Sequence, residues 1–108
     1  METLKVLGQS APPATTFTDL YTVPSSKSTV VSTITICNRG LTKGTFRIAV
    51  RPMGAMISNQ HYMVYNAVME IGAFTALTLG ITLGTTDIIT VYASTSDFSF
   101  SAFGSEVV

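Results

Sequence analysis

The feature that most constrains how this chain folds is a repeated alternation of apolar and polar side chains with a period of two residues. The alternation is cleanest in the segment 45–51. Its apolar set is Phe46, Ile48 and Val50, and its other set is Thr45, Arg47, Ala49 and Arg51. Successive side chains of a β-strand point to opposite faces of the sheet, so this segment is predicted to be a half-buried strand with two arginines on its open face.

The same period recurs in the segments 28–37, 87–94 and 97–103, and no stretch has a sustained helical period. In the first, Val30, Ile34 and Ile36 are predicted on one face, and Thr29, Val31, Thr33, Thr35 and Cys37 on the other. In 87–94, Ile89, Val91 and Ala93 are predicted to share one face, and in 97–103, Phe98, Phe100 and Ala102 are predicted to share one face. The second face of 28–37 is nearly as β-prone as the first, which predicts a central strand.

Weaker strands are predicted at 4–7, 19–22, 61–65 and 72–79, separated by proline, glycine and asparagine turns such as Gly80–Gly84. Seven to eight short strands at this spacing predict an all-β protein. The fold expected is a single antiparallel β-sandwich of the jelly-roll or Ig-like type. A small closed barrel is the alternative.

The chain of 108 residues is short enough for one domain. Its first part, 1–16, is expected to be an N-terminal strand and extended arm, and 17–108 the sandwich. The segment 8–16 has two prolines and no large apolar side chain. It could pair with the sheet edge of a neighbouring subunit or form an ordinary loop over its own domain.

Charged residues make up only 11% of the chain, against about 25% in an ordinary soluble domain. Hydroxyl side chains replace them, with 17 threonines and 11 serines. A monomer with so few charges has little protection against association. The composition therefore predicts that much of the surface is covered in an assembly, as in a homo-oligomer.

The charges that are present are divided along the chain. Every basic residue lies in the first 51 residues, namely Lys5, Lys27, Arg39, Lys43, Arg47 and Arg51. The first 51 residues carry a formal charge of +4 and the rest −4, with Glu70, Asp87, Asp97 and Glu106 in the second part. A pI near 6.5 gives no general attraction to nucleic acid. The split instead predicts a contact between the basic part of one copy and the acidic part of a neighbour.

Side chains that could serve in catalysis or metal binding are few in this sequence. His61 is the only histidine and Cys37 the only cysteine, which is expected to be a small buried side chain. No nucleophile motif, metal-ligand cluster or phosphate loop is found in the sequence. Asp87 and Asp97 follow turn residues, and turn chemistry accounts for both. We therefore expect no enzyme activity, no catalytic residues, no metal and no cofactor.

The sequence shows no signal for export or for a membrane. The N-terminus lacks a basic segment followed by an apolar run, and the longest uncharged stretches contain polar residues or glycines. We expect no secretory signal and no membrane partner.

Leu20-Tyr21-Thr22-Val23-Pro24 is followed by a predicted strand that ends in Cys37-Asn38, and then by the arginine-bearing segment at 45–50. This run resembles a small β-sandwich module found in structural proteins of tailed bacteriophages. The segments 87–94 and 99–104 resemble the module's final hairpin, so the similarity covers roughly 17–107. Residues 4–11 resemble the start of short stand-alone versions of the module.

This resemblance implies a non-enzymatic protein of the virion, assembled in the host cytoplasm. The first expectation is a capsid decoration or cement protein that stabilises the phage head, with the major capsid protein as partner. The alternative is a tail, baseplate or fibre component. The chain departs from the family pattern in the apolar segment 53–57, where Met53 and Met56 could mark a particular contact surface.

The candidate protein–protein contact residues are charged or methionine side chains: Arg39, Lys43, Arg47, Arg51, Met53, Met56, Asp87 and Asp97. A further alternative is a β-sandwich that binds host glycans, which needs exposed aromatic side chains on one face. Tyr62, Tyr65 and Tyr92 are candidates, but strand alternation places Tyr62 and Tyr65 on opposite faces.

Overall fold

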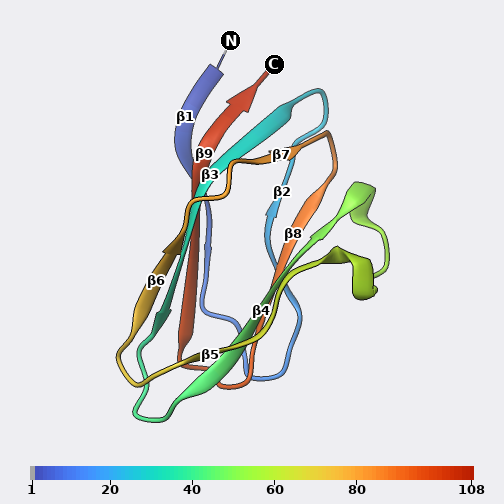
Figure 1. Cartoon of the computed structure of the whole chain (residues 1–108). Coiled ribbons are helices and arrows are strands. Elements are labelled where there is room, and N and C mark those ends of the chain that lie inside the picture. Colours follow the sequence, from blue (N-terminus) through green and yellow to red (C-terminus); the bar gives the residue numbers. More distant parts are fainter. Residues whose placement is uncertain (1) are drawn as a thin grey trace.

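The computed structural model describes residues 2–108, and these form nine β-strands in two antiparallel sheets (Figure 1). In chain order the strands are β1 (Glu2–Ser10), β2 (Thr18–Thr22), β3 (Ser28–Asn38), β4 (Gly44–Arg51), β5 (Tyr62–Met69), β6 (Phe74–Leu77), β7 (Ile81–Leu83), β8 (Ile88–Ala93) and β9 (Phe98–Val107). Sheet A has the order β1-β9-β3-β6, with β7 also paired to β3, and sheet B has the order β2-β8-β4-β5. Two short 3-10 turns, Pro52–Gly54 and Asn59–His61, lie between β4 and β5.

The strand pairs are nested along the chain. β1 pairs with β9, β2 with β8, β3 with β6 and β7, and β4 with β5, as in one long hairpin closed at the β4–β5 connection. The further pairs β3–β9 and β4–β8 wrap this hairpin into two layers. This order is that of a jelly roll, one of the two sandwich types expected. It is not a closed barrel, because no strand pair within residues 2–108 joins the two sheets.

The core lies between the sheets and is built from their inner faces. The shared faces predicted in β8 and β9 are confirmed, and both point inward: the buried residues include Ile89, Val91, Ala93, Phe98, Phe100 and Ala102. Phe46 and Ile48 of β4 meet them from sheet B, and Phe46 packs with its ring centroid 6.1 Å from that of Phe98. Each such large apolar side chain contributes about 1.5–3 kcal/mol on burial.

The prediction for the first part of β3 is wrong at Val30, which is 40% exposed, whereas Val31 is 1% exposed. The cause is a β-bulge. Val31 pairs with Gly104 of β9 and Thr33 with Phe103, so Ser32 is an extra residue in β3. One extra residue reverses which side chains face inward.

The segment between β5 and β8 also differs from the prediction. The strand expected at 72–79 is limited to β6, and part of the turn expected at Gly80–Gly84 is the short strand β7, with Leu83 buried. Gly80, at a φ of 62°, separates the two strands, and both pair with β3. The described residues therefore form nine strands, where the sequence predicted seven or eight.

The N-terminal segment forms an edge strand of sheet A, because β1 pairs with β9 of the same chain. The part predicted as strand and arm thus contributes a strand that runs to Ser10, beyond the expected 4–7. The two ends of the chain lie close together at one end of the molecule (Figure 1). Within residues 2–108, no helix has the length and apolarity that a membrane span requires.

Candidate functional site

A row of aromatic side chains around Arg47 crosses the outer face of sheet B. Arg47 on β4 lies directly opposite Tyr92 on β8, and its guanidinium carbon is 4.5 Å from the centroid of that ring. On its other side it lies 4.4 Å from the centroid of Tyr65 and 5.8 Å from that of Tyr62, both on β5. Phe17, just before β2, continues the row, with its centroid 4.8 Å from that of Tyr92. We call these five residues the aromatic row.

Strict strand alternation does not predict this row, because it places Tyr62 and Tyr65 on opposite faces. The two rings instead contact each other edge to face, with centroids 4.9 Å apart. The register of β5 against β4 shifts between them, since Tyr62 lies opposite Ala49 and Val64 opposite Ile48, which leaves Met63 as an extra residue. One extra residue in a strand breaks the alternation and brings the two tyrosines to the same face.

The guanidinium of Arg47 is held but not neutralised. Its Nε donates a hydrogen bond to Oδ1 of Asn66 at 2.7 Å. Within residues 2–108 no carboxylate lies in ion-pair distance of it, and its two terminal nitrogens have no hydrogen-bond partner. A cation over aromatic faces is attracted by about 0.5–1 kcal/mol at an exposed site. The two terminal NH₂ groups of Arg47 therefore remain free to donate hydrogen bonds to a ligand, beside the tyrosine rings.

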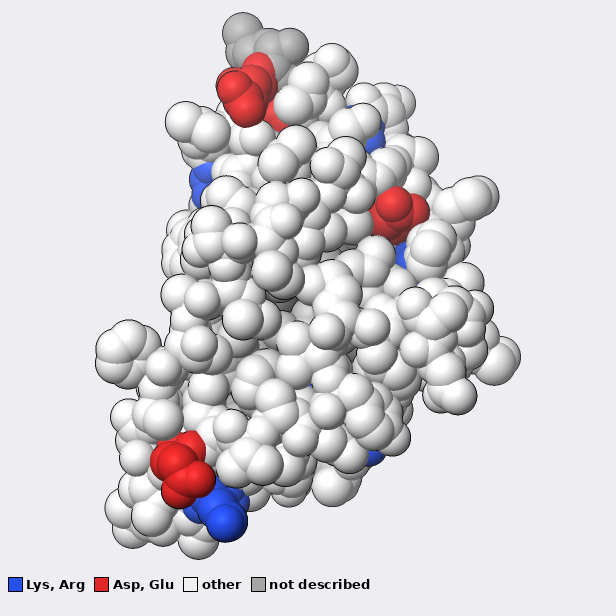
Figure 2. Space-filling view, in the orientation of Figure 1, with Lys and Arg blue, Asp and Glu red and all other residues white. Residues whose placement is uncertain are grey.

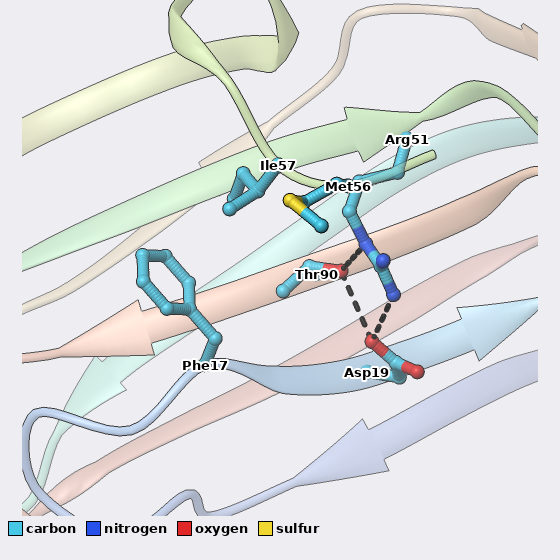
Figure 3. A pocket seen from close by; sticks show the side chains of 6 residues that line it. All are labelled: Phe17, Asp19, Arg51, Met56, Ile57 and Thr90. Carbon is cyan, nitrogen blue, oxygen red and sulfur yellow. Dashed lines mark hydrogen bonds and ion pairs between the residues drawn. The ribbon is translucent and has the colours of Figure 1, made fainter. Parts of the chain in front are cut away.

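Arg51, the second arginine of β4, is engaged inside the chain. One terminal nitrogen forms an ion pair with Oδ1 of Asp19 at 2.9 Å, and its Nε donates to the hydroxyl of Thr90 at 2.9 Å. The other terminal nitrogen donates to the carbonyl oxygen of Ala55 at 3.1 Å. The pair of Arg51 and Asp19 presents two planar polar groups side by side at the surface (Figure 3).

Two hollows adjoin the aromatic row. One has a volume of about 260 Å³ and is lined by Phe17, Asp19, Arg51, Met56, Ile57 and Thr90 (Figure 3). The other has a volume of about 360 Å³ and is lined by Asn59, Tyr62 and Tyr65. The connection between β4 and β5 contributes a wall to both, because it carries Met56, Ile57 and Asn59.

The two candidate methionines lie on this connection and are open to solvent. Met53 is 80% exposed and Met56 88% exposed. The backbone N–H of Met53 donates to Oδ1 of Asp87 at 2.9 Å, and Oδ2 of Asp87 accepts from the N–H of Gly84 at 2.8 Å. Asp87 thus ties the connection to the turn before β8, in keeping with the turn role predicted for it.

Three other candidate residues gather at the end of the sandwich where β3 turns into β4. Arg39 donates to the carbonyl oxygen of Ser96, and its backbone N–H donates to the carbonyl oxygen of Asp97. Lys43 is exposed in the same connection. The structure therefore brings Arg39 and Asp97 together and separates them from Arg47 and Arg51.

Buried Asn38 holds this end together. Its side-chain amide donates to the carbonyl oxygens of Thr42 at 3.0 Å, Met69 at 3.3 Å and Glu70 at 3.2 Å. Its Oδ1 accepts from the N–H of Gly40 at 3.0 Å. One side chain thus fastens the β3–β4 connection to the β5–β6 turn.

The outer face of sheet A has a different character, because four consecutive cross-strand rows of it carry no charged side chain. The rows combine β1, β9, β3 and the short edge strands. They contain Leu4, Ser105, Val30 and Thr82; Val6, Phe103 and Thr33; Gln9, Ser101, Thr35 and Ala76; and Ser99, Cys37 and Phe74. We call this surface the uncharged face. Cys37 lies on it half-buried, not in the core as expected.

Charged side chains are also sparse on the side of the molecule that Figure 2 shows. In the view of Figure 2, charged side chains lie mainly toward the ends and margins, and the centre is almost free of them. Depletion of charged side chains is typical of the buried core of a protein interface, and contiguous exposed apolar side chains mark interaction surfaces.

A carboxylate is buried between the sheets at the end that holds both termini. Glu106 of β9 is 3% exposed, and it accepts a hydrogen bond from the hydroxyl of Tyr21 at 2.6 Å. Lys5 and Lys27 reach its other oxygen at 3.3 and 3.4 Å. The hydrogen bond from Tyr21, helped by the two lysines, holds the pKa of Glu106 below its usual value. Burial, together with the bond to Glu106, raises the pKa of Tyr21 to about 12.

Groups for metal binding do not gather in the part of the chain that the structure describes, where no three His, Cys, Asp or Glu side chains come together. His61 accepts a hydrogen bond at Nδ1 from the N–H of Ser58 at 3.1 Å and so caps a 3-10 turn. The fold and its outer faces define a small jelly-roll domain with two chemically distinct surfaces.

Comparison with known proteins adds little to this description. No family model matches the chain, and no curated protein matches it in sequence. It is similar to a chain in the structure of the infectious bursal disease virus Gt strain, with 14% identity and a TM-score of 0.45. The similarity covers 97% of this chain and 31% of that chain, so this chain spans less than a third of that chain's length. At this TM-score we base no argument on the similarity.

Proposed function

We propose that the protein is a non-enzymatic structural component of a virion, a decoration or cement protein that binds and stabilises a phage head. The observation that carries the proposal is the uncharged face of sheet A. A face of apolar and hydroxyl side chains gains free energy when protein covers it, and its hydroxyl groups can be satisfied by partner groups. The major capsid protein is the partner we propose.

Two further points support the proposal. The sequence resembles a sandwich module of tailed-phage structural proteins in the segments that form β2, β3, β4, β8 and β9. The jelly roll is also a fold that viral capsid domains use, although a fold does not determine a function by itself.

Candidate contact residues outside the uncharged face fit this function to different degrees. Met53 and Met56 are exposed on an apolar connection, and methionine adapts well to irregular protein surfaces. Arg39 and Lys43 are exposed at the end of the sandwich. We propose these four as additional contacts at the rim of the assembly.

The experiment that tests the function is binding of the purified protein to expanded, empty capsids of the same phage. Wild-type protein should bind and raise the melting temperature of the capsid. Val30→Lys places a cation on the uncharged face and should weaken binding by about tenfold or more, which is about 1.4 kcal/mol. Absence of wild-type binding would rule out the cement role.

A matched control is Val68→Lys, because Val68 is exposed on sheet B. This variant should bind as the wild type does, and equal loss in both variants would count against the uncharged face as the docking surface. Circular dichroism and thermal melting of the free variants check that both fold.

The alternative is a tail, baseplate or fibre component that uses the same face. Electron microscopy of virions with labelled protein separates the two, because a cement protein decorates the head.

A further inference from the structure

We propose that the outer face of sheet B is a binding site for a carboxylated saccharide, with Arg47 as the residue that recognises the carboxylate. The proposal does not depend on the head-binding function, because it concerns the opposite sheet. Its starting point is the aromatic row, in which Tyr65 is 58% exposed and Phe17 is 43% exposed.

The recognition of a carboxylate follows from the free donors of Arg47. Its terminal nitrogens have no partner within residues 2–108, and its Nε is fixed by Asn66. The guanidinium is therefore oriented before a ligand arrives. A planar fork of N–H groups matches the two oxygens of a carboxylate in a bidentate pair.

The recognition of a sugar ring follows from the tyrosines next to that fork. One face of a pyranose ring presents C–H groups and packs against an aromatic ring, while its hydroxyl groups project from the edges. Tyr62 and Tyr65 line the 360 Å³ hollow together with Asn59, whose amide can donate to and accept from hydroxyls. This volume falls in the range of small-molecule sites, roughly 300–1,000 Å³.

The second hollow extends the site for a longer oligosaccharide. It combines the ring of Phe17 with the paired Asp19 and Arg51. The carboxylate of Asp19 and the guanidinium of Arg51 are held next to each other, and such a pair can form hydrogen bonds with two neighbouring hydroxyl groups of a sugar. The aromatic row connects the two hollows, since Phe17 is at one end and Tyr62 at the other.

A nucleic acid fits this face less well than a saccharide. A polyanion is bound by several phosphate-neutralising cations, and here Arg51 is already paired with Asp19. The half-exposed carboxylate of Asp19 would also repel a phosphate backbone. The single free guanidinium, that of Arg47, can pair with one carboxylate of a ligand whose negative charges are far apart.

The test is an NMR titration of the full chain with two pairs of probes that differ in charge. The pairs are sialyllactose with lactose, and galacturonic acid with its methyl ester. A carboxylated probe should shift resonances of Tyr65, Tyr92 and Arg47 and bind at least about tenfold more tightly than its neutral counterpart. Equal affinity within both pairs, or no shift with either carboxylated probe, would overturn the proposal.

Variants then assign the contacts. Arg47→Lys keeps the charge but loses the fork, and should weaken binding of the carboxylated probe by about tenfold. Tyr65→Ala should weaken it by about fivefold, whereas Tyr65→Phe should retain most of the affinity because the ring remains. Phe74→Ala, on the uncharged face, is the control and should bind as the wild type does.

The same spectra distinguish the other occupant, a second copy of the chain. If the resonances of the aromatic row shift on dilution of the protein and not on addition of sugar, the row is a contact between copies and the saccharide proposal fails. Thermal melting of each variant checks the fold, and Tyr65→Phe keeps the test valid should Arg47→Lys prove unstable.

Discussion

At the scale of single residues, Glu106 illustrates how a chain poor in charge can still bury a carboxylate. Three donors from three different segments surround it: the hydroxyl of Tyr21 and the ammonium groups of Lys5 and Lys27. A buried carboxylate without such partners would become protonated instead of remaining charged. The cluster therefore links β1, β2 and β9 at the end of the molecule that holds both termini.

This cluster predicts a pH dependence of stability. The pKa of Glu106 is lower in the folded protein than its ordinary value of 4.5, so the unfolded chain takes up the proton first as pH falls. The stabilisation is complete above about pH 4.5 and is lost as pH falls through the lower, folded-state pKa. Glu106→Gln should lower the free energy of unfolding at pH 7 by about 2 kcal/mol and flatten its decline toward pH 3. Urea unfolding at several pH values measures both, and parallel pH curves for variant and wild type would contradict it.

Asn38 is the second residue on which a large part of the structure depends. Its replacement by alanine removes the hydrogen bonds to the carbonyl oxygens of Thr42, Met69 and Glu70 and to the N–H of Gly40, although the carbonyl oxygen of Glu70 keeps its bond from the N–H of Ala73. Asn38→Ala should therefore destabilise the protein by about 3 kcal/mol, near the upper end for a single substitution. The exposed Asn59, which has no comparable set of bonds, supplies the control Asn59→Ala, expected within about 0.5 kcal/mol of the wild type. Similar unfolding midpoints for the two variants would contradict the role given to Asn38.

At the scale of elements, bulges decide which side chains reach the core and which reach the surface. In β3 the extra residue Ser32 moves Val31 inward and Val30 outward. In β5 the extra residue Met63, between Tyr62 and Val64, brings Tyr62 and Tyr65 to one face. Both proposed binding surfaces therefore depend on local departures from strict alternation.

The bulge in β3 needs a glycine opposite it. A Cβ at Gly104 would collide with the carbonyl oxygen of Val30, which belongs to the backbone and cannot move aside alone. Gly104→Ala should destabilise the protein by about 2 kcal/mol or more, through forced separation of β3 and β9. Gly84→Ala is the matched control, since a Cβ there would meet only Asp87 Oδ2, at an ordinary 3.6 Å. Equal stabilities of the two variants in denaturant would refute the proposed tight fit.

At the scale of the whole molecule, the nested pairing explains what becomes of the charge division along the chain. Because the hairpin ribbon places β1 beside β9, Lys5 from the basic part meets Glu106 from the acidic part inside one molecule. Arg51 is likewise neutralised within the chain, by Asp19. Among the basic residues, Arg39, Lys43 and Arg47 remain for the contact between copies that the sequence suggested, whereas Lys5, Lys27 and Arg51 are paired within the chain.

The two sheets also give the molecule two separate surfaces, which predicts that their functions are independent. Val30→Lys should weaken capsid binding and leave saccharide affinity within about twofold of the wild type, and Tyr65→Ala should do the reverse. Residues on opposite sheets share no partner, so their effects should add. Measuring both affinities for both variants and for the double variant checks this, and loss of both activities in either single variant would contradict it.

The alternation of side chains by itself determined the fold class and most of the core. The faces of β4, β8 and β9 were predictable from residues such as Phe46, Ile89 and Phe98, because burial of one strand face imposes a period of two over a regular strand.

Only the tertiary structure decided the exposure of Val30, the shared face of Tyr62 and Tyr65, and the pairing of Lys5 with Glu106. The first two depend on extra residues in β3 and β5, whose positions are set by the register against a neighbouring strand. The third joins residues 101 positions apart, and only the nested strand order brings them together. A local pattern records which face a residue occupies relative to its neighbours in sequence, whereas register and topology arise from partners that are distant in the chain.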